Sequence, residues 1–352
     1  DFSLDLLYSL NLVTHLSSYR TEVLRKIGGF RIGLEGSQDY DLALRVIEQI
    51  PASAIRHIPR ILYHWRAIPT SVAGNSGAKP YAFAKAREAI SSHFERTGTT
   101  ATVDKVIGGL NRARYQLPDP LPVCSLIIIG GHTGAIVTET KYPSLEMTMV
   151  GAAENISQSL NAAAASSSGE VLCFIDGSLE PLSTDWLREM VSLAIQPQIG
   201  PVGAKILRSD GGIDQTGFIL GGKDLVRKAH FGLPSDRNGN LFRASLIGNY
   251  SAVSARCMVI RRSVFEEIRG FDAEHFAENF FDADLCLRLW EGGYRVVYTP
   301  YAELIEVREG SRSAASDAEM EYFKSRWNEN LNRDPFYNPN FTDDGETFRY
   351  RI

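Results

Sequence analysis

The sequence contains few cysteines and no pair of them at metal-binding spacing. All four lie far apart, at Cys124, Cys173, Cys257 and Cys286. Disulfide-stabilised secreted domains are rich in cysteine, and structural zinc sites need Cys-x-x-Cys pairs or a similar Cys/His spacing. We therefore expect neither a disulfide-stabilised secreted domain nor a structural zinc site. We expect four buried thiols in a protein of a reducing compartment.

Long apolar runs and an excess of basic residues are also missing. The longest strongly apolar run, near residues 121–129, is far shorter than the ~20 residues that a membrane-spanning helix needs, and we recognise no signal peptide at the start. The formal net charge is −5, so we expect no nucleic-acid partner. Hydrophobic residues make up 44% and charged residues 22%, which is typical of soluble domains with a real core. A length of 352 residues suggests two domains.

An internal repeat divides the chain. Residues 19–45 and 260–288 each contain a short amphipathic helix, a Gly-Phe turn, an Asp-x-Asp-Leu segment and a helix ending near an arginine. Each copy then runs into a short apolar strand, at 55–59 and at 295–300. The same order at similar spacing, found twice, indicates two related domains.

The two copies differ in what precedes them. A Pro-rich linker at 117–122 leads into alternating apolar strands and helices before the second copy, which predicts an α/β fold with a mostly parallel sheet. The first copy has almost nothing before it. We therefore expect residues 1–117 to be the C-terminal half of a first domain plus a helical linker, and 118–352 to be a second domain with a C-terminal tail. On this interpretation the first domain needs upstream residues for its activity.

Five segments, in this order, resemble a known family. They are the helix 159–164, the strand 169–176, the segment 201–205, the Asp-x-Asp helix 282–288 and the closing stretch 334–340. Together they resemble family-2 glycosyltransferases with the GT-A fold, of the tandem-domain type that makes bacterial O-antigen, capsule or other surface polysaccharide. The resemblance implies a Rossmann-like, mostly parallel sheet flanked by helices, preceded here by the C-terminal half of a second GT-A-like domain.

The resemblance also implies an activity. It predicts an inverting enzyme that moves a sugar from a nucleotide-sugar donor to a growing glycan or lipid-linked glycan. It implies Mn²⁺ or Mg²⁺ as cofactor, because hard carboxylate oxygens suit these ions and the ion would offset the charge of the leaving diphosphate. It implies a cytoplasmic location, and it leaves open a peripheral association with the inner face of the membrane.

Catalytic bases are implied at the first Asp of each Asp-x-Asp segment. These residues are Asp282 in the second copy and Asp39 in the first, each of which would take the proton of an acceptor hydroxyl. The competing interpretation is that each caps the helix that follows. We expect the second Asp of each pair, Asp41 and Asp284, to be a helix N-terminal charge that favours the helix dipole.

Donor and metal residues are expected at strand ends. Asp176 ends a hydrophobic strand, where open α/β sheets bind ligands, and the resemblance makes it a donor-binding and metal residue. Ser178 stands where the family has a second acidic residue, which puts one metal ligand in doubt. His64 is implied to face the metal or diphosphate in the first copy. The equivalent stretch of the second copy has Glu306 and no histidine.

These departures leave a second hypothesis open. The second domain would be a degenerate glycosyltransferase that binds acceptor glycan or scaffolds an active neighbour. An alternative is that residues of a donor-site loop are missing from this sequence. Metal-dependent binding of a nucleotide sugar discriminates the enzyme from the degenerate domain.

Overall fold

The computed structural model describes residues 2–64, 80–130, 134–151, 153–308, 314–343 and 347–351. The chain folds as two compact units, Asp1–Gln116 (unit 1) and Leu117–Ile352 (unit 2). The Pro-rich segment 117–122 lies at the start of unit 2. No helix of the described residues is both long enough and apolar enough to cross a membrane.

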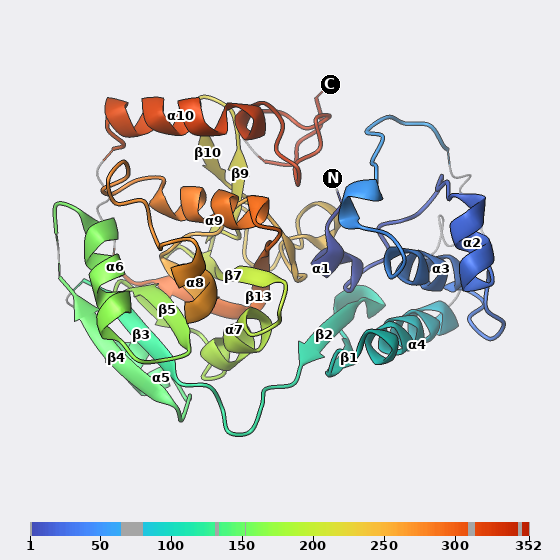
Figure 1. The fold of residues 1–352 in the computed structure, drawn as a ribbon, viewed down its shortest axis with the longest axis horizontal. Helices are drawn as coiled ribbons and strands as arrows, with labels where there is room; N and C mark the ends of the chain where they lie inside the picture. Colours follow the sequence, from blue (N-terminus) through green and yellow to red (C-terminus); the bar gives the residue numbers. More distant parts are fainter. Residues whose placement is uncertain are drawn as a thin grey trace. The chain divides into compact units, whose positions relative to one another are not determined.

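Unit 1 is built from helices and one antiparallel hairpin (Figure 1). Its core forms where α3 packs on α4, because alanines and Ile90 line one face of α4 and meet Tyr40 and Leu44 of α3. The elements are α1 (Leu4–Leu7), α2 (Thr21–Ile27), α3 (Gln38–Ile47), η1 (Ala52–Ala54), α4 (Pro80–Thr97), β1 (Ala101–Lys105), η3 (Ile107–Gly109) and β2 (Asn111–Tyr115).

Unit 2 is organised around one large sheet with the order β11-β13-β7-β12-β5-β3-β4. Strands β4, β3, β5, β7 and β13 all point the same way, while β12 and β11 run opposite. The expected α/β class with a mostly parallel sheet is confirmed. The path strands are β3 (Cys124–Ile129), β4 (Leu145–Val150), β5 (Val171–Asp176), β7 (Ile199–Leu207), β11 (Gly248–Asn249), β12 (Cys257–Arg261) and β13 (Arg295–Glu306).

Smaller strands and the helices complete unit 2. β6 pairs with β13, β8 pairs with β7, and β9 pairs with β10. The short strands are β6 (Leu179–Pro181), β8 (Ile213–Gln215), β9 (Phe218–Leu220) and β10 (Val226–Lys228). The helices are α5 (Gly134–Glu139), α6 (Ile156–Ser166), α7 (Trp186–Ala194), η4 (Asn240–Phe242), α8 (Arg262–Glu267), α9 (Phe281–Glu291) and α10 (Asp317–Asn332).

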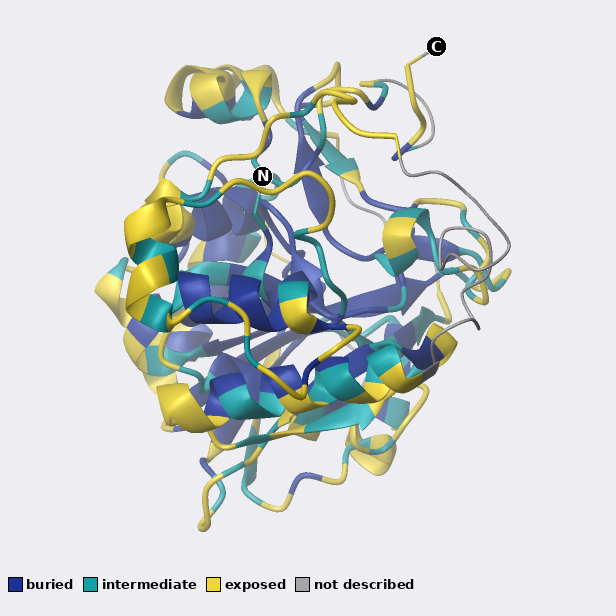
Figure 2. Cartoon of the chain, turned by 90° about the vertical axis from the view of Figure 1, so that its right-hand side faces the viewer, coloured by how far each residue is buried: buried dark blue, intermediate teal, exposed yellow. Residues whose placement is uncertain are grey.

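Helices cover both faces of this sheet. Neighbouring residues of β12 point to opposite faces: Met258 belongs to the main core with α6, α8 and α9, whereas Cys257 contacts Met190 of α7. Because both faces are covered, β7 is buried along its whole length. Figure 2 shows the strands of the sheet mostly in dark blue, the colour of buried residues.

All four cysteines are free and buried. Burial raises the pKa of each thiol, because the low-dielectric interior disfavours the thiolate. The expectation of buried, unreactive thiols is therefore confirmed.

Candidate functional site

Charged side chains meet at the carboxyl end of β5 in unit 2. Asp176 is the last residue of β5, and Arg256 immediately precedes β12, the strand paired to β5. The backbone nitrogen of Asp176 donates to the carbonyl oxygen of Arg256 at 2.8 Å, which fixes the two residues side by side. Asp214 lies on β8 and Glu306 ends β13. The pairing of these strands brings all four residues to the carboxyl ends of the parallel strands. Open α/β folds bind their ligands at this end of the sheet.

Arg256 lies among three carboxylates. Its Nε donates to Asp176 Oδ2 at 3.2 Å and its Nη1 donates to Asp214 Oδ2 at 3.0 Å, while its Nη2 donates to Glu306 Oε1. We call Asp176, Asp214 and Glu306 the carboxylate cluster. A guanidinium suits this arrangement, because its N–H groups can donate hydrogen bonds to several oxygens at once.

The cluster is largely shielded from solvent. The side chains of Arg256 and Asp214 are 8% and 5% exposed, and those of Asp176 and Glu306 are 22% and 18% exposed. Lys228 adds a second cation, with its Nζ 2.7 Å from Asp214 Oδ1 and its side chain 41% exposed. The three carboxylates of the cluster, Arg256 and Lys228 together carry a formal charge of −1.

Ser178 lies at the cluster as the sequence predicted. Its backbone nitrogen donates to Asp176 Oδ1 at 2.9 Å, and its hydroxyl oxygen is 3.4 Å from Arg256 Nη2. The first contact makes a tight turn after β5, of the kind that Asp side chains favour. The structure therefore brings Asp176 and Ser178 together, although the serine adds no charge.

The residues at the end of β5 do not fit the divalent metal that the resemblance implies. Each oxygen of Asp176 accepts one hydrogen bond, and the donor to Oδ2 is the positively charged guanidinium of Arg256. Asp214 and Glu306 also face Arg256. Within the described ranges, no group of three His, Cys, Asp or Glu residues could hold a metal ion. A metal role for Asp176 stays a prediction: its side-chain partner in this structure is the guanidinium of Arg256, which disfavours a divalent cation beside it.

His64, the other predicted metal residue, belongs to unit 1 and not to the unit that contains Asp176. His64 is exposed and lies in a stretch without regular secondary structure. Residues 65–79, which follow it directly, are outside the described residues. A metal role for His64 in a first domain stays a prediction.

Asp282 lies in the first turn of α9 and is 4% exposed. Its Oδ1 accepts from the backbone nitrogen of Ala283 at 2.9 Å, and its Oδ2 accepts from that of Ala255 at 3.0 Å. The first contact satisfies an amide of the first helical turn, but Asp282 is not the cap of α9, whose N-cap residue is Phe280. The second links Asp282 to the residue before Arg256, so that the predicted base and the carboxylate cluster share one corner of unit 2.

Asp39 has the matching position in unit 1. It lies in the first turn of α3, and its Oδ1 accepts from the backbone nitrogen of Tyr40 at 2.9 Å, as Asp282 does with Ala283. Its Oδ2 accepts from Asn11 Nδ2 at 3.2 Å. Among the described residues of unit 1, the β1–β2 hairpin is the only sheet. Asp39 therefore has no parallel strand end beside it in this part of the chain.

The second Asp of each pair forms a buried ion pair, which is more than the dipole contact we expected. In unit 2, Asp284 is fully buried and accepts from Arg288 Nε at 2.7 Å. Arg288 in turn donates to the carbonyl oxygens of Ile268 and Gly270, both at 2.7 Å. This network ties the first turns of α9 to the Gly-Phe turn before it.

Unit 1 contains the same network. Asp41 is fully buried and accepts from Arg45 Nε at 2.8 Å, and Arg45 donates to the carbonyl oxygens of Ile27 and Gly29 at 2.8 and 2.6 Å. Each Gly-Phe turn also has two consecutive residues with positive φ, Gly28 and Gly29 in one unit and Arg269 and Gly270 in the other. The repeat in the sequence is thus a repeat of contacts, and Arg45 and Arg288 are equivalent.

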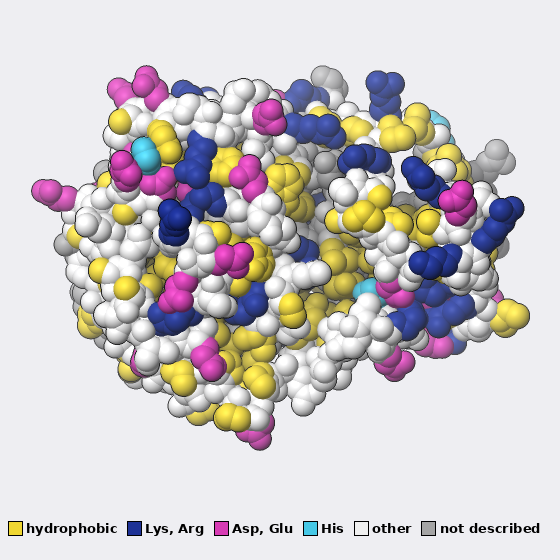
Figure 3. Space-filling model, viewed as in Figure 1, with side chains coloured by type: hydrophobic (Ala, Val, Ile, Leu, Met, Phe, Trp, Pro, Cys, Tyr) yellow, Lys and Arg dark blue, Asp and Glu magenta, His cyan; other side chains and the backbone are white. Residues whose placement is uncertain are grey.

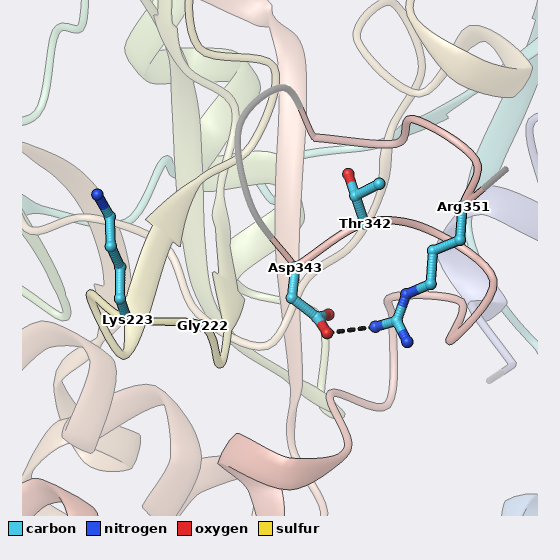
Figure 4. Close-up of a pocket in the computed structure, with 5 residues that line it drawn as sticks. All are labelled: Gly222, Lys223, Thr342, Asp343 and Arg351. Atoms are coloured by element: carbon cyan, nitrogen blue, oxygen red, sulfur yellow. Dashed lines mark hydrogen bonds and ion pairs between the residues drawn. The ribbon is translucent and has the colours of Figure 1, made fainter.

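A shallow groove elsewhere on unit 2 is lined by residues outside the cluster. Figure 4 shows Asp343 paired with Arg351 on one side and Gly222 and Lys223 on the other. Its lining includes none of the residues at the end of β5. Over the face of unit 2 shown in Figure 3, Lys and Arg side chains are interspersed with Asp and Glu.

Sequence reasoning missed Arg256 and Asp214. A signal was present for Arg256, which stands in Ser254-Ala255-Arg256-Cys257 directly before the apolar run 257–260. An arginine at the end of a buried strand needs a buried acidic partner. The partners are 80, 42 and 50 residues away along the chain, so that only the fold identifies them.

Two curated proteins are similar along almost the whole chain. The "Uncharacterized protein y4gI" of Sinorhizobium fredii is 35% identical, and the match covers 97% of this chain and 42% of that protein. The "O-antigen biosynthesis protein RfbC" of Myxococcus xanthus is 30% identical, with 97% of this chain and 30% of that protein covered. The chain thus spans less than half the length of these relatives.

Family and structure comparisons add to this. A solved structure of GalNAc-T7 with UDP, GalNAc and Mn²⁺ matches at 12% identity with a TM-score of 0.46, over 61% of this chain and 50% of that one. We draw no conclusion about this chain from a TM-score this low. The sequence profile described as "Glycosyltransferase like family 2" matches residues 132–330, which is more than half of the chain. This chain therefore belongs to glycosyltransferase family 2.

Proposed function

We propose that this chain is part of an inverting glycosyltransferase that moves a sugar from a nucleotide-sugar donor to a growing glycan, or lipid-linked glycan, of a bacterial surface. Family membership supports sugar transfer, and the relative printed as an O-antigen biosynthesis protein supports the class of product. We place the reaction in the cytoplasm, at the inner face of the membrane where lipid-linked acceptors are found. The observation that carries the proposal is that Asp282 and Asp176 accept hydrogen bonds from neighbouring residues, Ala255 and Arg256, and so lie at the same corner of unit 2.

In this proposal Asp282 is the general base of unit 2. The acceptor hydroxyl loses its proton to a carboxylate oxygen of Asp282 as its own oxygen bonds to the anomeric carbon. The bond from that carbon to the diphosphate breaks, and the diphosphate leaves with the electron pair. A carboxylate oxygen has two acceptor positions, so the bonds from Ala255 and Ala283 leave one on each oxygen of Asp282.

Asp176 and Ser178 take the donor role. They lie in the turn after β5, where a sugar nucleotide would meet the carboxyl end of the sheet. Asp39 takes the role of base in a first domain, because its position in α3 matches that of Asp282 in α9.

A second candidate function rests on a different observation. The carboxylate cluster is closed by Arg256 and keeps one net negative charge, which disfavours an anionic diphosphate. Unit 2 would then be a degenerate domain that binds acceptor glycan or scaffolds an active neighbour.

Calorimetric titration of the chain with UDP-, GDP- and dTDP-sugars separates the two. The enzyme hypothesis expects saturable binding of one donor that is lost in Asp176→Ala. Asp317→Ala, at an exposed carboxylate in the first turn of α10, is the matched control and should bind normally. Absence of binding across the whole panel would favour the degenerate domain.

A further inference from the structure

Arg256 has the position and the charge that make it a substitute for a metal ion. A hard divalent cation at a strand end needs several carboxylate oxygens that converge on one point. Asp176, Asp214 and Glu306 do converge, but on the guanidinium of Arg256. The three side chains come from three different strand ends, so the convergence is a property of the fold.

The guanidinium is not easily displaced. Arginine keeps its proton under all ordinary conditions, and the Arg256 side chain is 8% exposed. Moving it out would leave Asp176 and Glu306 without their cation and Asp214 with Lys228 alone, which is strongly unfavourable in a partly buried site. A metal ion would have to overcome this cost as well as its own dehydration.

We propose that Arg256 is a built-in cation that replaces the divalent metal in unit 2, so that unit 2 binds no divalent metal and holds a nucleotide-sugar diphosphate without one. Arg256 and Lys228 together carry the two positive charges that one divalent ion would supply. Ser178 agrees with this arrangement, because a second carboxylate in its position would add a negative charge that Arg256 could not balance. The statement on metal is independent of the proposed function, whereas the statement on the donor rests on it.

Electron paramagnetic resonance of Mn²⁺ tests the metal statement on the full chain without any donor. The unaltered chain should leave the signal of free Mn²⁺ unchanged. Arg256→Met keeps much of the side-chain volume and removes the charge. It should bind Mn²⁺ at a concentration at least about tenfold below the highest one at which the unaltered chain shows no binding, because Asp176 and Glu306 then lose their cation and Asp214 keeps only Lys228.

The controls decide which residues are responsible. Asp176→Asn combined with Arg256→Met should lose the gained Mn²⁺ binding, whereas Asp317→Asn with Arg256→Met should keep it. Mn²⁺ binding by the unaltered chain that disappears in Asp176→Asn overturns the proposal. That outcome can be observed even where Arg256→Met fails to fold.

The donor statement is tested by repeating the nucleotide-sugar titrations in EDTA and in Mn²⁺. Equal affinity in both supports a metal-free donor site. Binding that needs Mn²⁺ overturns the inference and leaves the proposed transferase intact. Absence of donor binding under both conditions overturns the donor statement together with the proposed function, while a gain of Mn²⁺ binding in Arg256→Met would still support the role of Arg256 as the cation.

Discussion

Asp282 and Asp284 lie two residues apart in one helical turn, and their side chains do different things. Asp282 accepts from two backbone amides, one of them that of Ala255, whereas Asp284 accepts from Arg288 and from Trp327 Nε1, which is 3.0 Å away. Because the helix turns 100° per residue, the two carboxylates leave it in different directions. The first is available for chemistry, and the second stabilises the fold.

Replacing Asp282 by asparagine should abolish transfer and spare the fold. The amide cannot accept the proton of the acceptor, and general-base catalysis contributes about 10²–10⁴-fold. We expect kcat to fall by about that factor in a steady-state assay, with an unchanged circular dichroism spectrum. Asp39→Asn is the matched control and should leave any transfer by unit 2 unaltered. Full activity of Asp282→Asn would remove this residue as the base.

Replacing Asp284 by asparagine should destabilise unit 2. The change leaves Arg288 without its buried partner, and breaking such a pair typically costs about 3–5 kcal/mol. Urea unfolding followed by tryptophan fluorescence measures this loss. Asp317→Asn, an exposed first-turn carboxylate on α10, should change the free energy of unfolding by less than about 0.5 kcal/mol. Equal stability of the two variants would contradict a stabilising role for Asp284.

At the scale of elements, the C-terminal segment of unit 2 packs on β9 and β10. Phe341, Phe348 and Tyr337 form a small buried core with Ile219 of β9. His230, just after β10, stacks on Phe348 with ring centroids 4.5 Å apart, and its Nδ1 is 2.9 Å from Thr216 Oγ1. Burial lowers the pKa of His230 from 6.5 to about 3, because the interior disfavours the imidazolium.

This histidine should make the stability of unit 2 depend on pH. Below pH 6.5 the unfolded chain takes up a proton at His230 that the folded chain refuses, so stability is highest above 6.5 and falls as the pH drops toward 3. The loss is about 1.4 kcal/mol per pH unit within that window. Between pH 7 and pH 5 we expect His230 to contribute a loss of roughly 2 kcal/mol in the free energy of unfolding.

Urea unfolding at pH 7, 6 and 5 tests this in the unaltered chain and in His230→Gln. Glutamine is polar and does not titrate, so the variant should show a smaller decrease over the same range. Other titrating groups affect both proteins equally, which makes the difference between the two curves specific to His230. Parallel curves would show that His230 is not the source.

Several elements could be predicted from the sequence. The alternating strands and helices expected between the Pro-rich linker and the second copy of the repeat include β3, β4, β5, α6 and α7. They could be predicted because apolar runs and helical periodicity are local signals. The direction of β12 could not, since a strand with four apolar residues pairs equally well in either direction until its neighbours are placed.

At the scale of the whole molecule, the two units share one motif in different settings. Both contain the Gly-Phe turn, the Asp-x-Asp helix and the arginine that joins them. Unit 2 adds the large sheet, and the matching sheet is not found among the described residues of unit 1. We propose that unit 1 is the C-terminal half of a first glycosyltransferase domain, with residues up to 117 as its part of the chain.

Residues 117–352 should fold without the rest of the chain. Unit 2 has its own core around the central sheet, and domains with a separate core generally unfold independently. We expect the isolated segment to unfold cooperatively in urea. Its midpoint should equal that of the unit 2 transition in the full chain, which is the transition that Asp284→Asn shifts. An isolated segment that is aggregated or unstructured would show that unit 2 depends on unit 1.

The sequence by itself determined the repeat, the order of strands and helices, and the equivalence of Asp39 with Asp282, because these are patterns of neighbouring residues. Only the tertiary structure decided what surrounds Asp176. Its cation, Arg256, is 80 residues away, and Asp214 and Glu306 arrive from two further strands. Whether a carboxylate faces a metal or an arginine depends on which strand ends meet, and strand pairing is a long-range property that a local pattern does not encode.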